Sequence, residues 1–279
     1  ERLGIAFEQL TQLNPRLVYC SVTGYGASGP LRSKAGYDQV LQTMTGMCAM
    51  QAKEDGPPEI LYGSVVDYYA SALVAAGVSS ALYERTQSGL GQHVGVSLLR
   101  AALTMQSARL VWAEGEPREI GRDMRSGGIT GIHPTRAGHI YISANTPHFW
   151  QALCEKIGLP ELAANPRYAS VRLRAQHHAE LVPLLRQALA ARSALEWETL
   201  FGEAVPCAAA RAVEDMFDHP QVAAEDMITD IPDPTLGSYR GFTRAIAFDR
   251  TPGPQPFAAP TLGQHTQMLR DTLGSATGQ

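Results

Sequence analysis

The apolar residues of the first 113 positions alternate between strand-length runs and helical spacing. Residues 17–22 form a nearly continuous apolar run, which is typical of a buried parallel strand. Residues 93–98 alternate as a second strand, and residues 60–66 indicate a short strand or an extended segment. Helical spacing predicts helices over 1–13, 37–50, 67–85 and from residue 99 to about residue 112. Such alternation of helices and strands predicts an α/β domain.

The pattern changes after position 113. Residues 115–138 are rich in glycine and predict loops, and residues 139–144 alternate as a strand. Residues 147–203 are predicted to be mostly helical, and residues 226–248 to contain short strands. Residues 251–264 form a tail rich in proline and glycine, and residues 269–273 are expected to form a closing helical turn.

The chain is therefore expected to have three parts. Residues 1–113 are part of a large domain, residues 114–225 are a linker with a smaller α+β domain, and residues 226–279 are strands and a C-terminal tail that returns toward the large domain.

Composition narrows the classes of partner. Apolar residues make up 44% of the chain and charged residues 18%, which is typical of a globular protein. A net charge of −4 provides no basic field for nucleic acid or for an anionic membrane. No apolar run approaches the roughly 18 residues of a membrane span, and no signal peptide is recognisable. Because the four cysteines form no CxxC pair, we expect reduced thiols and a cytoplasmic protein.

Asp67 has two interpretations. An aspartate at the start of a helix is commonly an N-cap that accepts hydrogen bonds from the first helical turn. The same position suits a nucleophile, because the helix dipole favours an ionised carboxylate that can attack a carbonyl carbon. Free N–H groups nearby could then stabilise an oxyanion. Residue spacing alone leaves both interpretations open.

A glycine-rich loop over residues 23–30 follows the first predicted strand. Glycines let backbone N–H groups approach an anion, but the loop matches neither the GxxxxGK[ST] nor the GxGxxG phosphate motif. As a phosphate loop it is therefore a weak match by itself, and the alternative interpretation is a tight exit from the strand. Arg32 and Lys34 follow the loop, either as ligands of a phosphate or as solvated surface charges.

The histidines and serines indicate neither a metal site nor a hydrolase. The eight histidines contain no HExxH pair, and His177 and His178 are adjacent, so on a helix they point about 100° apart. No serine lies in a GxSxG motif. We therefore expect no metal and no serine hydrolase chemistry.

Several stretches in order resemble the class III CoA-transferase family, which includes formyl-CoA transferases and carnitine-pathway CoA-transferases. The stretches are Asn14-Pro15-Arg16-Leu17-Val18-Tyr19, Thr23-Gly24-Tyr25-Gly26 with Gly29-Pro30, Gly36-Tyr37-Asp38 with Gln42, Gly56-Pro57-Pro58 followed by Asp67, Gly89-Leu90-Gly91-Gln92, His219-Pro220-Gln221-Val222 and the segment from Pro260 to Thr266. Together they span almost the whole chain.

The resemblance implies an enzyme that moves CoA from an acyl-CoA to a carboxylic acid through a covalent aspartyl-CoA thioester on Asp67. It implies no metal or redox cofactor, since coenzyme A enters as a thioester substrate. It also places Arg32, Lys34, Gly36, Tyr37 and Gln42 in the substrate and CoA site. Gly127 and Gly128 resemble, less closely, the family's glycine loop over the active site.

A related activity stays open as an alternative. The α-methylacyl-CoA racemases share the fold and the aspartate, but they pair it with a histidine at the position of Tyr37. Racemisation moves an α-proton between two bases. A tyrosine, with an unperturbed pKa of about 10, replaces that histidine poorly. Tyr37 therefore favours transfer over racemisation.

The resemblance also implies a longer protein. Family members carry an upstream Rossmann-like segment that supplies most CoA contacts, and Glu1-Arg2-Leu3-Gly4 resembles a stretch well inside a full chain. We thus expect a Rossmann-like large domain that is incomplete at its N-terminus. The full-length form is expected to be an interlocked homodimer. An inactive truncated copy is the third alternative.

Overall fold

The computed structural model describes residues 3–52, 56–115 and 129–276. The chain forms two compact units, Glu1–Arg122 and Asp123–Gln279, and each is described by itself. Helices and strands alternate in the first unit and a small antiparallel sheet lies among helices in the second, so the fold is mixed α/β, as the sequence predicts.

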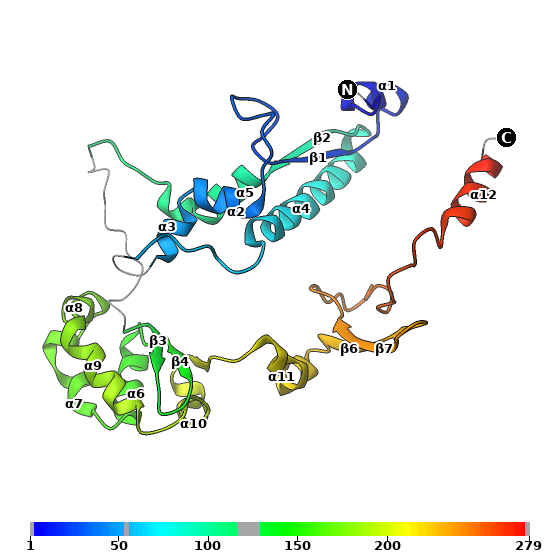
Figure 1. Ribbon diagram of the computed structural model, residues 1–279. Helices are drawn as coiled ribbons and strands as arrows, with labels where there is room; N and C mark the ends of the chain where they lie inside the picture. The colour runs from blue at the N-terminus through cyan, green and yellow to red at the C-terminus, as the bar shows by residue number, and fades with distance from the viewer. Residues whose placement is uncertain (1–2, 53–55, 116–128, 277–279) are drawn as a thin grey trace. The chain divides into compact units, whose positions relative to one another are not determined.

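Two parallel strands organise the first unit. β1 (Tyr19–Thr23) pairs with β2 (His93–Ser97) in register from Tyr19 opposite His93 to Thr23 opposite Ser97. The connection between them contains α2 (Asp38–Met44), α3 (Met47–Gln51) and α4 (Val65–Ser88), as a parallel pair requires a long crossover. Figure 1 shows α4 running alongside the strand pair. α1 (Phe7–Leu13) precedes β1, and α5 (Leu98–Met105) follows β2 directly.

The core of this unit lies where α2, α4 and α5 meet. Its buried members are Tyr25, Leu41, Met47, Val66, Ala70, Val96, Leu98, Ala101 and Ala102. Tyr25 after β1 and Leu41 on α2 therefore belong to one core with residues in the first turns of α4 and α5. This packing brings the glycine loop, the Gly36-Tyr37-Asp38 stretch and the start of α4 together.

The long helix α4 is apolar enough to resemble a membrane span. With 24 residues, most of them apolar, it qualifies by length and composition alone. The sequence shows no long uninterrupted apolar run here, because Asp67, Glu84 and other polar residues are spread along the helix. The core helix of a globular protein has the same composition, and α4 packs against β2, α2 and α5 within its unit.

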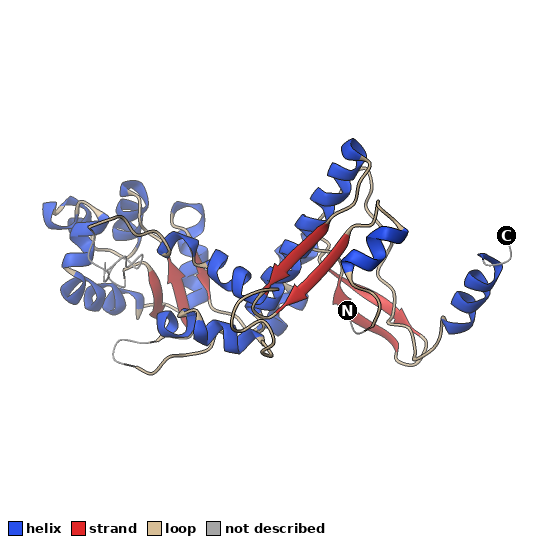
Figure 2. Cartoon of the chain, turned by 90° about the horizontal axis from the view of Figure 1, so that it is seen from above, coloured by secondary structure: helices blue, strands red, loops and turns tan. Residues whose placement is uncertain are grey.

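The second unit contains a three-stranded antiparallel sheet. Its strands are β3 (Gly131–Pro134), β4 (His139–Ile142) and β5 (Cys207–Ala209), with β4 in the centre. Figure 2 shows the sheet beside a group of helices. These helices are α6 (Pro147–Lys156), α7 (Pro160–Ala164), α8 (Val171–Gln176), α9 (His178–Leu189) and α10 (Ala194–Phe201). Ile140, Leu153, Leu181 and Phe201 are among the fully buried side chains of their shared core.

The C-terminal part of the chain is a hairpin with flanking helices. β6 (Ile228–Asp233) pairs antiparallel with β7 (Gly237–Phe242), after α11 (Pro220–Ala224). Between Phe242 and α12 (Thr266–Ala276) the chain forms no regular element, in agreement with its content of proline and glycine.

Four sequence predictions of elements were wrong. The helix expected from residue 99 to about residue 112 is α5, which ends at Met105, because Gln106 leaves the helical conformation and a separate short turn follows over Ser107–Arg109. The helix expected over 37–50 is broken into α2 and α3 at Gly46, whose φ of 85° lies in the left-handed region. The segment 60–66 is no strand, because its end already belongs to α4. β3 lies in a stretch predicted as loop, since a four-residue strand with glycine and proline at its ends carries no alternating signal.

Candidate active site

Asp67 is the third residue of α4, so it does not open the helix as the sequence predicted. The helix begins at Val65, and its N-cap residue Ser64 makes no side-chain hydrogen bond to the first turn. The cap comes instead from α2. Oδ2 of Asp38 accepts hydrogen bonds from the backbone N–H groups of Val66 (2.7 Å) and Asp67 (3.0 Å). Asp67 is therefore not the N-cap of this helix.

The Asp38 carboxylate is held in turn by Gln42. Nε2 of Gln42, one helical turn later on α2, donates to Oδ1 of Asp38 at 2.5 Å. Oε1 of Gln42 accepts from the N–H of Leu61 at 2.9 Å. Asp38 is 2% exposed and Gln42 is completely buried, so these bonds form away from solvent, where an unpaired polar group would be costly.

The Asp67 side chain itself is half-buried. Burial raises the pKa of its carboxyl group, and the negative charge of Asp38 raises it further. We had expected the helix N-terminus to favour the ionised form, and here these two effects act against it. Among the described residues, no side chain or backbone group donates a hydrogen bond to this carboxylate. Such a carboxylate is less stabilised by its surroundings and is accordingly a better nucleophile.

The glycine loop and the Gly36-Tyr37-Asp38 stretch touch through their backbones. A Cβ atom built on Gly36 would lie 2.7 Å from Cα of Gly24, and one built on Gly24 would lie 2.8 Å from Cα of Gly36. The carbonyl oxygen of Gly24 also accepts a hydrogen bond from the N–H of Leu99 in α5. The glycines in these two motifs are thus required for a close approach that fixes the residues just before Asp38.

The other predicted site residues lie on the same loop-rich stretch, at the surface. Tyr37 is the N-cap residue of α2 and its side chain is 70% exposed. Arg32 and Lys34 are exposed in two successive turns. Their positions are open to a ligand, and their contact with CoA stays a prediction. Gly127 and Gly128 lie outside the described residues.

A cavity that was not predicted lies on one face of the parallel strand pair. It has a volume of about 370 Å³ and is lined by side chains that alternate along the two strands, by the glycine loop and by the start of α5. The lining residues with polar side chains are Ser21, Thr23, Tyr25, Ser28, His93, Ser97 and Arg100. Oγ of Ser21 lies 2.7 Å from Nε2 of His93. The carboxyl ends of parallel strands often bind ligands, and this rule is the signal that could have found the cavity.

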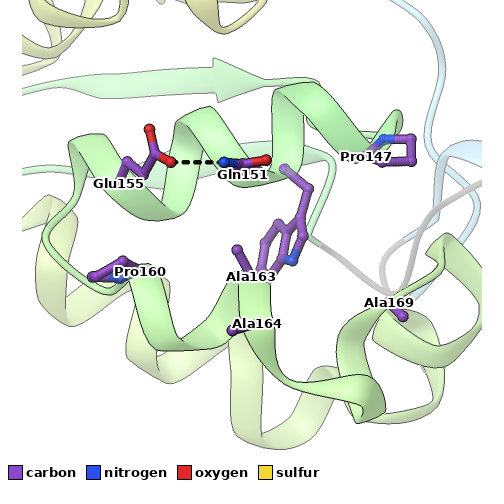
Figure 3. A pocket seen from close by; sticks show the side chains of 8 residues that line it. Pro147, Gln151, Glu155, Pro160, Ala163, Ala164 and Ala169 are labelled. Atoms are coloured by element: carbon purple, nitrogen blue, oxygen red, sulfur yellow. Dashed lines mark hydrogen bonds between the residues drawn. The ribbon is translucent and has the colours of Figure 1, made fainter.

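A second cavity lies in the other unit, between α6 and α7. Its volume is about 420 Å³, and small apolar residues and prolines line most of it. Figure 3 shows Pro147, Ala163 and Ala164 along it, with Gln151 donating a hydrogen bond to Glu155 at 2.9 Å. None of the predicted site residues that the structure describes lines this cavity.

Metal-binding side chains are spread apart in the part of the chain that the structure describes. Across residues 3–52, 56–115 and 129–276, no three histidine, cysteine, aspartate or glutamate side chains lie close enough together to hold a metal ion.

Known proteins resemble the chain in sequence and in fold. It is 31% identical to an acyl-CoA transferase of Fusarium pseudograminearum over 98% of the chain and 61% of that protein. It is also 31% identical to the succinyl-CoA–D-citramalate CoA-transferase of Chloroflexus aurantiacus, over 98% of the chain and 70% of that protein. The crystal structure of Rv3272 from Mycobacterium tuberculosis superimposes with a TM-score of 0.81 at 27% identity, over 96% of this chain and 72% of that one.

The family assignment follows from a match over nearly the whole chain. The chain spans less than two thirds of the length of the F. pseudograminearum relative. Residues 1–266 match the model of CoA-transferase family III, which confirms the resemblance seen in the ordered sequence motifs. The chain belongs to CoA-transferase family III.

Proposed function

We propose that the intact protein containing this chain transfers CoA from an acyl-CoA to a carboxylic acid, with Asp67 as the covalent nucleophile. The observation that carries the proposal is the local setting of Asp67 in the first turn of α4. Its backbone N–H is fixed by Asp38 at the start of α4, while its carboxylate is half-buried and unpaired among the described residues. The membership of CoA-transferase family III supplies the reaction class.

The proposed reaction proceeds in balanced covalent steps. An oxygen of the Asp67 carboxylate attacks the thioester carbonyl carbon, and the carbon–sulfur bond breaks to give a mixed anhydride and CoA thiolate. The thiolate then attacks the aspartyl carbonyl carbon, which releases the donor as a free carboxylate and leaves an aspartyl-CoA thioester. An acceptor carboxylate reverses the two steps, so it leaves as the new acyl-CoA and Asp67 is restored.

The surrounding residues are proposed to bind CoA. Arg32 and Lys34 are exposed cations beside the glycine loop, suited to phosphate groups. Tyr37 is exposed next to Asp38 and would contact the acyl group. Gln42 is fully buried, so we assign it an indirect part in the site. The polar cavity on the β1–β2 face, with Arg100 at its edge, offers a further place for an anionic part of the substrate.

We also propose the arrangement of the intact protein. Residues 1–113 would belong to a Rossmann-like large domain, which the parallel pairing of β1 and β2 around the α4 crossover supports. Residues 114–225 would form the linker and the smaller domain, and residues 226–279 the tail. The intact protein is proposed to be an interlocked, cytoplasmic homodimer, and the four free cysteines are in keeping with a reducing compartment.

A half-reaction tests the proposal. Without an acceptor acid, the intact enzyme should release one equivalent of donor carboxylate from an acyl-CoA and keep the CoA bound covalently. Asp67→Asn should release none, because an amide cannot attack the thioester. Asp230→Asn, an exposed aspartate on β6, is the matched control and should behave as the wild type. Full transfer by Asp67→Asn would exclude the covalent mechanism. The name of the C. aurantiacus relative pairs succinyl-CoA with a dicarboxylate, so dicarboxylic acids are the first acceptors to assay.

A further inference from the structure

One face of α2 holds the whole segment that leads into α4. Asp38 and Gln42 lie four residues apart, so their side chains share a face of the helix. Between them they bind backbone groups of Leu61, Gly63, Val66 and Asp67. The segment between Leu61 and Asp67 contains no strand, and Ser64, the N-cap residue of α4, makes no side-chain hydrogen bond to the first turn. The hydrogen bonds from α2 therefore hold this segment in place.

We infer that Asp38 is a positioning residue for the proposed nucleophile Asp67, and that Gln42 fixes Asp38 in the required orientation. The inference rests on the proposed function of Asp67. Asp38 does not touch the reacting atoms in this account. It holds the first turn of α4, and thereby the Asp67 Cα, through two N–H···O bonds to a single carboxylate oxygen.

The negative charge of Asp38 has two effects that a neutral capping side chain would not have. Bonds from N–H groups to an ionised carboxylate are roughly twice as strong as neutral ones. The negative charge also lies close enough to Asp67 to contribute to the raised pKa of its carboxyl group. Asp38 therefore restrains the backbone of Asp67 and makes its carboxylate more basic by the same placement.

Other titratable groups do not account for that contribution. The elements packed against α4 carry Tyr19 and Cys20 on β1, His93 on β2 and Arg100 on α5. Apart from burial, Asp38 is the one cause of the Asp67 shift among the described residues. Removing the charge of Asp38 should consequently alter the pH dependence of the reaction. A change in packing alone should leave the pH dependence as it is.

Asp38→Asn in the intact enzyme tests the inference. The asparagine oxygen can still accept from the two N–H groups, but the charge is gone, and the new amide nitrogen faces the Nε2 donor of Gln42 in place of the oxygen that accepted from it, so the side chain has to shift. We expect kcat to fall on the order of 100-fold from a small displacement of Asp67. Because the pKa of Asp67 is lowered when the like charge is removed, the acid limb of kcat/KM should move to lower pH.

Two further variants separate positioning from stability. Gln42→Met keeps the volume and the Asp38 charge but loses the bonds to Asp38 and Leu61, so kcat should fall while the acid limb stays at the wild-type pH. Ser193→Ala removes the N-cap of α10 in the other unit, where the serine Oγ accepts from the N–H of Glu196. It should lower thermal stability and leave both kcat per folded molecule and the pH profile unchanged.

The outcomes are distinct. An unmoved acid limb in Asp38→Asn, or a loss of activity that only follows the loss of folded protein, would overturn the inference, and so would wild-type kcat in Gln42→Met. If Asp38→Asn does not fold, Gln42→Met decides the positioning claim alone. Each of these results leaves the proposed function intact as long as Asp67→Asn is inactive. Activity in Asp67→Asn would instead remove the proposed function itself.

Discussion

Because Gly24 and Gly36 lie so close together, an alanine at position 36 is expected to destabilise the first unit. In Gly36→Ala the new Cβ would lie 2.7 Å from Cα of Gly24, 3.3 Å from Cδ2 of Leu41 and 3.4 Å from Cε2 of Tyr25. Non-bonded carbon atoms prefer about 3.5–4.0 Å, so the contact with Gly24 cannot be relieved by a side-chain rotation. The φ angle of Gly36 is outside the left-handed region, and the cost is therefore steric and not conformational.

The size of the destabilisation in Gly36→Ala follows from how tightly the neighbouring side chains are packed. Leu41 is completely buried and Tyr25 is 8% exposed, so the added methyl group has to displace packed core atoms or the loop backbone. Overpacking of this kind costs about 1–3 kcal/mol. Gly95→Ala on β2 is the matched control, because a Cβ at that position meets no atom within 4 Å and the backbone is not left-handed. It should stabilise the protein by about 0.4–1 kcal/mol.

Hydrogen exchange followed by mass spectrometry is the suitable assay, because a protein of two units need not unfold in one step. Peptides from β1 and α2 should exchange faster in Gly36→Ala than in the wild type, and the increase in rate should correspond to a loss of about 1–3 kcal/mol. The same peptides of Gly95→Ala should not exchange faster than in the wild type. Wild-type protection in Gly36→Ala, or an equal loss of protection in both variants, would refute the described contact.

Three further outcomes are expected in the second unit. Arg174→Met should lower the free energy of opening of the second unit by about 2–4 kcal/mol in hydrogen exchange of its α6 and α8 peptides, since Arg174 is 2% exposed and its guanidinium group donates to three backbone carbonyls that would lose their partner; unchanged protection would contradict this. Burial raises the pKa of the Cys154 thiol to about 12, so peptide mapping after treatment with a thiol reagent at pH 8 should find Cys154 unlabelled until the protein unfolds. The hydrogen bond and ion pair with Arg211 lower the pKa of Glu198; its contribution to stability is therefore present above the pKa of an unfolded glutamate and is lost as the pH falls through the lowered value. Glu198→Gln should accordingly show a weaker fall in thermal stability over that acidic range, and an identical pH dependence to the wild type would argue against the pair.

The sequence predicted most of the first unit because its signals are local. β1 and β2 appear as an apolar run and an alternating run, and α4 as an Ala-rich helical pattern that ends near Gly89. The break at Gly46 and the short strand β5 were not predicted, because a single glycine and three residues are too little for a periodic pattern.

The candidate site was predictable only in part. Asp67 was identified at a helix start together with family motifs, and the Asp38-x-x-x-Gln42 spacing was visible within the Gly36-Tyr37-Asp38 motif. That Asp38, and not Asp67, caps α4 depends on a contact across 28 residues, which no local pattern contains. The backbone contact between Gly24 and Gly36 is of the same kind.

Asp67 is proposed to carry CoA covalently during transfer. Peptide mass spectrometry of the intact enzyme, after incubation with a panel of acyl-CoAs in the absence of an acceptor, tests this most directly. We expect a CoA adduct on the peptide that contains Asp67, lost in Asp67→Asn and discharged when an acceptor acid is added. Turnover by an enzyme that carries no adduct on that peptide, or an adduct that persists in Asp67→Asn, would contradict it.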